Sequence, residues 1–274
     1  MIRRRAALGG LLALTALAAV VPAAGAGARI TRVLPPAGAR FDYQLGGAYP
    51  PPAGVEIVSR DRTARPATGL YSLCYVNAFQ TQPDENAWWQ RNHPELLLRR
   101  GGRLVIDPGW PGERILDTST GAKRARLAAI VGRWIAGCRR AGFAAVEPDN
   151  LDSYTRSKGR LTRAMNLAYA RLLVRHAHDL GLAIAQKNLA EIAPVGHSRI
   201  GFDFAVAEEC QVYRECASYI RGYGRRVYEI EYSDNGGIAG FRAACSRGGT
   251  RISIVYRDRD LTVPGSASYV YRAC

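Results

Sequence analysis

The sequence predicts an α/β fold, a (β/α)8 barrel of the TIM type in a single domain with some shortened helices. Eight short apolar or alternating segments recur after residue 40, and helical periodicity fills several of the intervals between them. Alternation of strands with helices is the pattern of a parallel sheet covered by helices. Eight strands in a chain of 274 residues favour a closed barrel over the main alternative, a doubly wound open sheet.

The predicted strands are short runs of apolar or alternating residues, which is the pattern of a partly or fully buried β-strand. RLVI (103–106) is an additional candidate outside the main series. The eight main candidates are FDYQL (41–45), VEIVS (55–59), LYSLCYV (70–76), FAAVE (143–147), LAIAQ (182–186), FDFAV (202–206), RVYEI (226–230) and ISIVY (252–256).

Helical periodicity is clearest in two intervals between predicted strands. From Ala122 to Arg140 the apolar residues recur on one stripe, and Gly142 follows as a stop signal. From Thr162 to Leu180 the same pattern recurs and is closed by Gly181. Both segments therefore predict amphipathic helices that pack on the sheet.

Residues 1–28 predict a secretory signal peptide. The chain begins with a basic stretch that includes three arginines, continues with an apolar run from Ala6 to Val21, and reaches Ala-x-Ala cleavage sites at Ala24 to Ala28. We therefore expect a secreted protein in which residues 29–39 form a linker and residues 40–274 form the barrel domain. No later segment is long and apolar enough to anchor the mature protein in a membrane.

The six cysteines are consistent with export, because an oxidising compartment permits disulfides. Cys210 and Cys216 flank one short turn and are the easiest pair to propose. Cys245 with Cys274 fixes the C-terminus in this interpretation. The remaining two, at positions 74 and 138, form either a third bridge or two buried thiols.

The formal net charge of +15 is carried almost wholly by arginine. Strongly basic proteins often bind nucleic acid. The arginines of this chain are scattered and form no aromatic-lined basic block, so we expect no nucleic-acid partner. With 47% hydrophobic and 22% charged residues the composition is that of a globular protein, and we expect a monomer.

Polar residues gather where the predicted strands end. VEPDNLDSY (146–154) brings Glu147, Asp149 and Asp152 directly after the apolar run GFAA. In a parallel barrel the C-terminal ends of the strands and the following loops form the active site, so we expect these side chains to converge on one pocket. The other candidates at strand ends and in nearby loops are Tyr43, Tyr75, Asp107, Trp110, Asn150, Lys187, Asn188, Glu208, Glu209, Tyr213, Glu231 and Tyr232.

Two carboxyl groups that face each other across a cleft suit the hydrolysis of a glycosidic bond. One donates a proton to the leaving oxygen, while the other attacks the anomeric carbon or activates water. The rings of Tyr43, Tyr75, Trp110, Tyr213 and Tyr232 can lie against sugar faces. The sequence therefore predicts a polysaccharide as the partner of the pocket.

The histidines and cysteines form no ligand pattern for a metal ion. His176 and His178 are two residues apart on a predicted helix and point in different directions, and no HExxH or CxxC motif is present. The GxSxG motif of serine hydrolases and phosphate-binding glycine loops are absent too. We expect neither a metal nor a cofactor.

Several blocks in this sequence resemble a known family. VEPDNLDSY, AQKN, FDFAVAEECQVYREC and EIEY, with FDYQL and LCYVNA upstream, are similar to the signature blocks of glycoside hydrolase family 114, the endo-α-1,4-polygalactosaminidases. The blocks run in order from about residue 40 to the C-terminus. The combination of DN-x-D, then KN, then EEC-x(5)-C is specific, whereas each block alone is weak.

The resemblance implies a (β/α)8 barrel that cuts internal α-1,4 linkages in galactosamine-rich polysaccharide. It implies one catalytic acid at the end of the fourth strand, which is Asp149, and a second at the end of the sixth, which is Glu208 or Glu209. Period-two alternation with Ala205 and Ala207 favours Glu209 as the inward residue. The family pattern tolerates glutamine at the second position, which favours Glu208, and we adopt Glu208 with Glu209 as a tuning neighbour.

The remaining candidates have structural as well as functional interpretations. Asn150 and Asp152 can hydrogen-bond within their own loop. Lys187 can form a structural ion pair or hold Asp149 ionised. Glu231 can end its strand or bind a substrate ammonium group. The alternative to an enzyme is a secreted carbohydrate-binding barrel that uses the same pocket without turnover.

Overall fold

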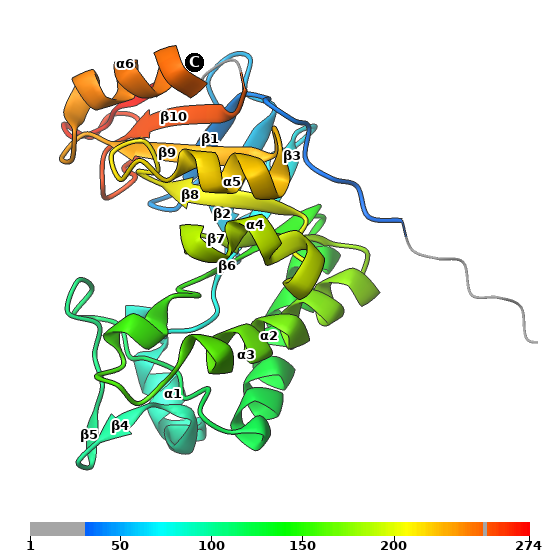
Figure 1. The fold of residues 1–274 in the computed structure, drawn as a ribbon, viewed down its shortest axis with the longest axis vertical. Helices are drawn as coiled ribbons and strands as arrows, with labels where there is room; N and C mark the ends of the chain where they lie inside the picture. The colour runs from blue at the N-terminus through cyan, green and yellow to red at the C-terminus, as the bar shows by residue number, and fades with distance from the viewer. Residues whose placement is uncertain (1–30, 249–250) are drawn as a thin grey trace, which may run out of the picture.

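A computed structural model describes residues 31–248 and 251–274 of the chain (Figure 1). The predicted signal peptide, residues 1–28, lies outside the described residues. Within the described residues, no helix combines the length and the apolar character needed to cross a membrane.

Eight parallel strands form the barrel, and they follow one another around it in sequence order. The predicted (β/α)8 architecture is confirmed. The ninth strand, β11 (Tyr271–Ala273), adds antiparallel to the last barrel strand. The barrel strands are β1 (Phe41–Gln44), β2 (Ile57–Asp61), β3 (Tyr71–Asn77), β6 (Ala145–Asp149), β7 (Ala183–Lys187), β8 (Phe204–Glu208), β9 (Val227–Tyr232) and β10 (Ser253–Arg257).

A buried arginine bridges the seam where β10 returns to β1. The guanidinium of Arg257 is inaccessible to solvent and donates to Asp42 Oδ1 at 3.0 Å and to the carbonyl oxygen of Tyr43. It also donates to the carbonyl oxygen of Thr262 at 2.9 Å, in the segment after β10. A buried charge of this kind is tolerated because its hydrogen-bonding groups are paired.

Alternate residues of the strands divide the core into two layers. Phe204 and Val206 belong to the cluster that fills the barrel, together with residues from the other strands. Ala205 and Ala207 belong to the cluster between the strands and the helices. The expectation that these alanines point into the barrel is therefore wrong. Their small side chains instead allow α5 (Cys216–Tyr223) to pack against β8.

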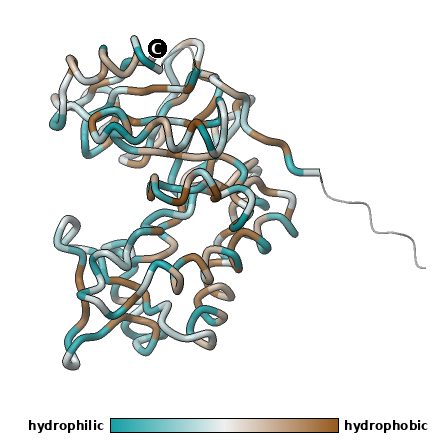
Figure 2. The backbone as a smooth tube through the Cα atoms, viewed as in Figure 1, coloured by the Kyte–Doolittle hydropathy of each residue, from teal (hydrophilic) through white to brown (hydrophobic). Residues whose placement is uncertain are grey.

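The two predicted amphipathic helices are present as α2 (Gly121–Ala141) and α3 (Arg163–Asp179). Both have a threonine N-cap that accepts from the backbone N–H three residues later. Hydrophobic and hydrophilic colours alternate along them, as expected where one side of a helix packs on the sheet (Figure 2). The shorter helices are α1 (Asn86–Asn92), α4 (Ala193–Val195) and α6 (Gly237–Gly248), with single turns at Pro83–Glu85, Pro94–Leu96, Ser153–Arg156, Ala190–Ile192 and Gly196–Ile200.

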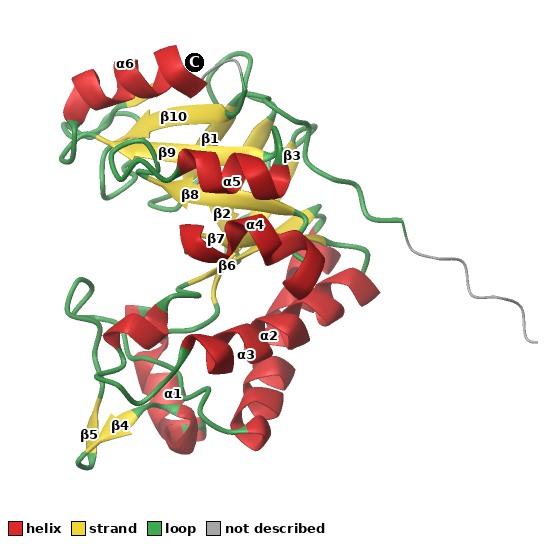
Figure 3. Ribbon diagram, in the orientation of Figure 1, coloured by secondary structure: helices red, strands yellow, loops and turns green. Residues whose placement is uncertain are grey.

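The helical layer is unevenly distributed around the barrel. Loops connect β1 to β2 and β2 to β3, whereas helices follow β3, β6, β7, β8 and β9 (Figure 3). The segment after β3 is the longest excursion and contains α1 and a small hairpin of β4 (Arg99–Arg100) and β5 (Arg103–Leu104). The additional candidate RLVI thus forms part of this hairpin and does not join the barrel. In Figure 1 the excursion lies at the bottom, at the opposite end from α6.

Three disulfides link segments of the described chain. Cys74–Cys138 joins β3 to α2, so the two thiols left open by the sequence form the third bridge. Cys210–Cys216 closes the turn after β8, and Cys245–Cys274 joins α6 to the C-terminus. Both expected pairings are present.

Candidate active site

A pocket of about 520 Å³ opens at the C-terminal ends of the barrel strands. Its inner wall comes from the strand ends, and its outer wall comes largely from the excursion after β3 and the loop after β6. The residues that line it are Tyr43, Leu45, Gly46, Asp61, Tyr75, Gln82, Asp107, Gly109, Trp110, Glu113, Asp149, Asn150, Asp152, Arg156, Lys187, Asn188, Glu208, Tyr232, Arg259, Asp260 and Leu261.

Lys187 stands among three carboxylates at the base of the pocket. Its Nζ lies 3.1 Å from Asp149 Oδ1, 3.4 Å from Glu208 Oε2 and 3.5 Å from Glu147 Oε1. Burial opposes the charge on Lys187, but Asp149, Glu208 and Glu147 outweigh it and raise the lysine pKa well above its usual value. Lys187 therefore remains an ammonium ion. We call Glu147, Asp149, Lys187 and Glu208 the strand-end cluster.

Asp149 is the last residue of β6 and is held as an anion. The Tyr75 hydroxyl donates to its Oδ2 at 2.8 Å, and Lys187 donates to its Oδ1. Burial disfavours ionisation, but Lys187 and then the Tyr75 hydrogen bond outweigh it, so the pKa of Asp149 lies below its usual value. A carboxylate in this state can act as a nucleophile.

Glu208 is the last residue of β8 and reaches the same space from the other side. The Tyr232 hydroxyl donates to its Oε1 at 2.6 Å, and Asn188 Nδ2 donates to its Oε2 at 2.9 Å. Asn188 also accepts from the backbone N–H of Glu208 at 2.9 Å, so both the strand end and the carboxyl group are fixed. The side chain is 27% exposed, which leaves it open to a ligand in the pocket.

The two carboxylates lie close to each other. Their nearest oxygens are 3.1 and 3.4 Å from the same lysine nitrogen, so those oxygens are separated by at most the sum of the two distances. Carboxyl groups about 5–5.5 Å apart are typical of retaining glycosidases, and about 6.5–9.5 Å of inverting ones. The bound applies to one oxygen of each carboxyl group and is compatible with either class.

Glu147 lies below Asp149 on the same face of β6 and is inaccessible to solvent. Tyr43 and Ser59 each donate a hydroxyl hydrogen bond of 2.6 Å to its carboxyl oxygens. Burial raises the pKa of Glu147 to about 7, although Lys187 and these hydroxyls act in the opposite direction. Glu147 thus supports Tyr43 and Lys187 from beneath the pocket.

Glu209 points away from this cluster. Its backbone adopts a φ of 58°, in the left-handed region, and its side chain pairs with Arg259 at 2.7 Å. The guanidinium of Arg259 stacks over the ring of Tyr232 at 4.0 Å. Glu209 therefore reaches the pocket only through Arg259, whereas Glu208 faces it directly.

The outer side of the pocket carries a second group of side chains, four charged and one aromatic, which we call the loop wall: Asp107, Trp110, Glu113, Asp152 and Arg156. The Arg156 guanidinium lies 2.6 Å from Asp107 and 2.8 Å from Asp152. Glu113 accepts from Asn77 Nδ2 at 2.9 Å. Burial raises the pKa of Glu113 to about 7, and the Asn77 hydrogen bond opposes this only in part. Trp110 is 52% exposed at the rim.

Most of the predicted site residues come together in this pocket, but Glu209, which pairs with Arg259, and two others do not line it. Tyr213 is 59% exposed and lies outside the pocket lining, and its hydroxyl accepts from Asn235 Nδ2 at 3.4 Å in the loop after β9. Glu231 lies on the outer side of β9, because Tyr228, Ile230 and Tyr232 take the inner side. These two expectations of pocket residues are corrected.

Sequence reasoning did not identify several residues that form the site. Ser59 is the last residue of the predicted strand 55–59, so the rule that strand ends form the site could have identified it. Glu113 and Arg259 lie in loops and Arg156 ends a single helical turn, so no periodicity predicts the direction of their side chains. Their place in the pocket depends on the path of the chain after β3, β6 and β10.

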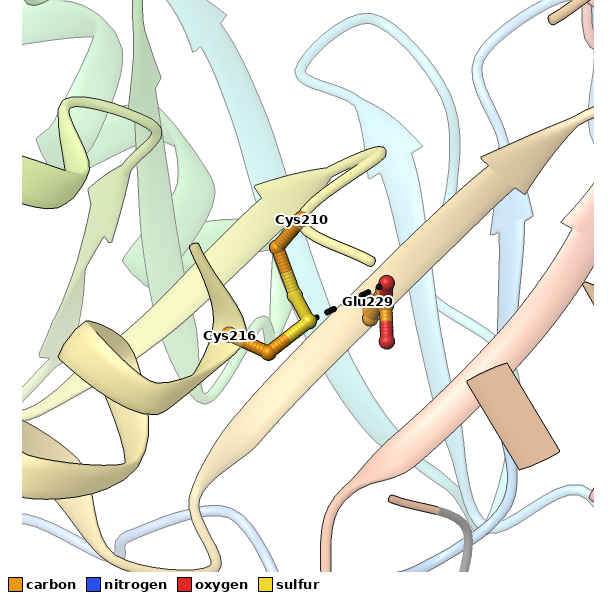
Figure 4. Close-up of side chains that lie close together, drawn as sticks. All are labelled: Cys210, Cys216 and Glu229. Atoms are coloured by element: carbon orange, nitrogen blue, oxygen red, sulfur yellow. Dashed lines mark hydrogen bonds between the residues drawn. A yellow bond between two sulfur atoms is a disulfide. The ribbon is translucent and has the colours of Figure 1, made fainter. Parts of the chain in front are cut away.

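One cluster in the described part of the chain has side chains close enough to suggest a metal site: Cys210, Cys216 and Glu229 (Figure 4). The two cysteines form a disulfide, and a disulfide sulfur is not the thiolate that binds a metal. This chemistry does not fit a metal ion.

The fold and the pocket can be compared with known proteins. A family model described as "Glycoside-hydrolase family GH114" matches residues 22–274. The solved structure of Ega3 from Aspergillus fumigatus, in complex with galactosamine, superimposes with a TM-score of 0.71 at 24% sequence identity. That match covers 90% of this chain and 100% of the Ega3 chain.

A bacterial structure has the same fold. The glycoside hydrolase domain of PelA from Pseudomonas aeruginosa superimposes with a TM-score of 0.55 at 15% identity, covering 84% of this chain and 99% of that domain. At these identities both structures show a common fold with this chain. A comparison with curated protein sequences finds no match.

Proposed function

The chain belongs to glycoside-hydrolase family GH114 and is a glycoside hydrolase, and we propose that it is a secreted enzyme cleaving internal α-1,4 linkages of galactosamine-rich polysaccharide. Family membership confirms the resemblance that the sequence blocks carried. The single observation that supports the chemistry is the approach of Asp149 and Glu208 to one lysine at the floor of an open pocket.

We assign the role of nucleophile to Asp149 and the role of acid and base to Glu208. Asp149 attacks the anomeric carbon while the Glu208 carboxyl group donates its proton to the leaving glycosidic oxygen, which breaks the glycosidic bond. Glu208 then takes a proton from water, whose oxygen attacks the anomeric carbon and releases Asp149. The net result is hydrolysis with retention of configuration. The ionised state of Asp149 beside Lys187 supports its role as nucleophile in this version.

The charge of the pocket supports a cationic substrate. Seven acidic residues line it against three basic ones, although the whole chain has a formal net charge of +15. An amino sugar without its acetyl group carries an ammonium ion at neutral pH, and a local excess of carboxylates attracts it. The Aspergillus neighbour was solved with galactosamine, which agrees with this choice of sugar.

The test uses purified protein with a partly N-acetylated α-1,4-galactosamine polymer. We expect new reducing ends, products that are oligomers and not free sugar, and a first-formed product with the α configuration by NMR. Binding of the polymer without new reducing ends would support the non-catalytic barrel instead. A first product with the β configuration would overturn the retaining mechanism, because it requires direct attack by water.

A further inference from the structure

Two glutamates lie on the outer side of β9, apart from the pocket. Glu229 is 0% and Glu231 is 1% exposed. Ala207 on β8 and Ile254 on β10 lie beside Glu229, and Tyr256 on β10 lies beside Glu231. A pair of carboxyl groups so placed is costly unless it is hydrogen-bonded. The mechanism proposed for the pocket does not use either of them.

Both glutamates accept a hydrogen bond from the same backbone N–H. The N–H of Gln211 donates to Glu229 Oε1 at 2.9 Å and to Glu231 Oε1 at 3.1 Å. The Oε2 atom of each is also buried and has no hydrogen-bond partner among the described residues. Two ionised carboxylates have only acceptor oxygens and cannot hydrogen-bond to each other. One proton shared between them makes one group a donor and the other its acceptor. Burial, together with Glu231, raises the pKa of Glu229 well above its usual value, consistent with such a proton.

Gln211 belongs to the turn that follows Glu208. The backbone N–H of Glu209 donates to the carbonyl oxygen of Ile230 at 2.7 Å, which ties the start of the turn to β9. The Cys210–Cys216 disulfide closes the turn, and its Cys216 sulfur lies 3.5 Å from Glu229 Oε1 (Figure 4). The turn is thus attached to β9 at the position next to Glu208 and again at Gln211.

We propose that Glu229 and Glu231, sharing one proton, are positioning residues that fix the turn after β8 through the Gln211 N–H and thereby orient Glu208. When the proton leaves, two adjacent buried carboxylates repel each other, and the attachment of the turn weakens. The consequence for Glu208 rests on the function proposed above. The consequence for the turn does not.

The surroundings of the pair contain few groups that can replace the shared proton. A small cavity beside Glu229, of about 330 Å³, has Arg221 of α5, Arg247 of α6 and Arg251 at its exposed rim. None of these arginines forms an ion pair with either glutamate within the described residues. Tyr256 stands opposite Glu231 on β10. The pair thus depends on its own proton.

The decisive variant is Glu231→Gln, because a glutamine keeps an acceptor for Gln211 and supplies an N–H to Glu229 that does not titrate at these pH values. Both proteins should lose kcat at alkaline pH when Glu208 loses the proton that it donates. In the wild type we expect this alkaline loss of kcat to be at least about tenfold larger than in Glu231→Gln, with little change in KM, because only the wild type also loses the proton of the pair. Glu229→Ala with Glu231→Ala should lower kcat about tenfold or more at every pH.

The matched control is Glu215→Gln, since Glu215 lies exposed in the same disulfide-closed turn and contacts neither glutamate. It should show the wild-type pH profile. An alkaline loss of kcat in Glu231→Gln equal to that of the wild type would overturn the inference, because the pair would then not be its cause.

A measurement independent of hydrolysis follows the Gln211 amide by hydrogen exchange, expressed as a protection factor at each pH. We expect the wild type to lose protection at Gln211 at alkaline pH, Glu231→Gln to keep it, and the double alanine variant to lack it throughout. Full protection in the double alanine variant would overturn the inference. Absence of hydrolysis by the wild type would instead overturn the proposed function, while the exchange experiment would still decide about the turn.

Discussion

Asp149 of the strand-end cluster and Glu113 of the loop wall line one pocket, but the charge of these two carboxyl groups is controlled in opposite ways. In the strand-end cluster the ammonium of Lys187 lies within 3.5 Å of three carboxylates and keeps the pKa of Asp149 low. In the loop wall Arg156 is already bound to Asp107 and Asp152, so burial dominates and raises the pKa of Glu113 to about 7.

The opposite pKa shifts of Asp149 and Glu113 suit two different tasks, nucleophilic attack and recognition of a cation. A nucleophile must be ionised before the substrate arrives, and a fixed lysine on a strand end ensures this. A group that recognises a cation can remain neutral in the empty pocket and ionise when the cation binds, because the bound charge lowers its pKa. We therefore expect changes in the strand-end cluster to affect kcat, and changes in the loop wall to affect KM.

The largest expected effect comes from the two proposed catalytic carboxylates. Asp149→Asn and Glu208→Gln should each lower the rate of hydrolysis by more than about a thousandfold, because loss of a nucleophile or of an acid and base removes a step of the reaction. Reducing-end assays measure this. Glu209→Gln is the matched comparison and should stay within about tenfold of the wild type. A larger loss from Glu209→Gln than from Glu208→Gln would reverse the assignment.

Removal of the Lys187 ammonium, which three carboxylates share, should have the next largest effect. Lys187→Met leaves three carboxylates without their counterion, so the unfolding free energy should fall by about 3–5 kcal/mol. The wild-type pKa of Asp149 is depressed by Lys187, and without the lysine it must rise. The acidic limb of the kcat/KM profile should therefore move to higher pH. Lys158→Met, at an exposed lysine, serves as control, and an unmoved acidic limb in Lys187→Met would contradict the role of the lysine.

A smaller effect is expected from the loop wall. Glu113→Gln should raise KM for a deacetylated galactosamine polymer about fivefold to tenfold and leave kcat nearly unchanged. In the wild type KM should fall as pH rises through about 7, since Glu113 becomes a carboxylate there, and the variant should lose this dependence. A fully N-acetylated polymer is the control, because it carries no cation. An equal rise of KM for both polymers would show that Glu113 does not recognise the ammonium group.

The smallest effect is expected at the rim. Trp110→Ala removes an aromatic surface that a sugar ring can contact, and KM should rise about threefold. Tyr213→Ala is a matched change, because Tyr213 is equally exposed but lies outside the pocket. Binding isotherms with galactosamine oligomers distinguish the two, and equal losses would show that Trp110 has no special contact.

The fold could be predicted largely from the sequence because each barrel strand is marked by its own residues. Apolar runs fixed eight strands to within a few residues, and the glycine after each long helix marked its end. The strand-end rule also placed Asp149, Lys187 and Glu208 correctly at one mouth, since all parallel strands end on the same side.

The remaining features depend on contacts that periodicity does not encode. Alternation alone could not tell which side of β8 faces the barrel, because Ala205 and Ala207 suit a narrow interior as well as a close helix. The loop wall was only partly predicted. Asp107 and Trp110 followed from a strand candidate that forms a hairpin instead, and Glu113 follows a path that only the folded excursion defines.

The identity of residue 187 has a chemical reason in a chain with only three lysines among 38 basic residues. A planar guanidinium presents its hydrogens in a fork that matches one carboxylate. An ammonium ion is a compact point charge whose three N–H bonds point in different directions. Three carboxylates, two from β6 and one from β8, can share the second kind of cation but not the first. An arginine at this position would satisfy one acid and leave its neighbours to repel each other.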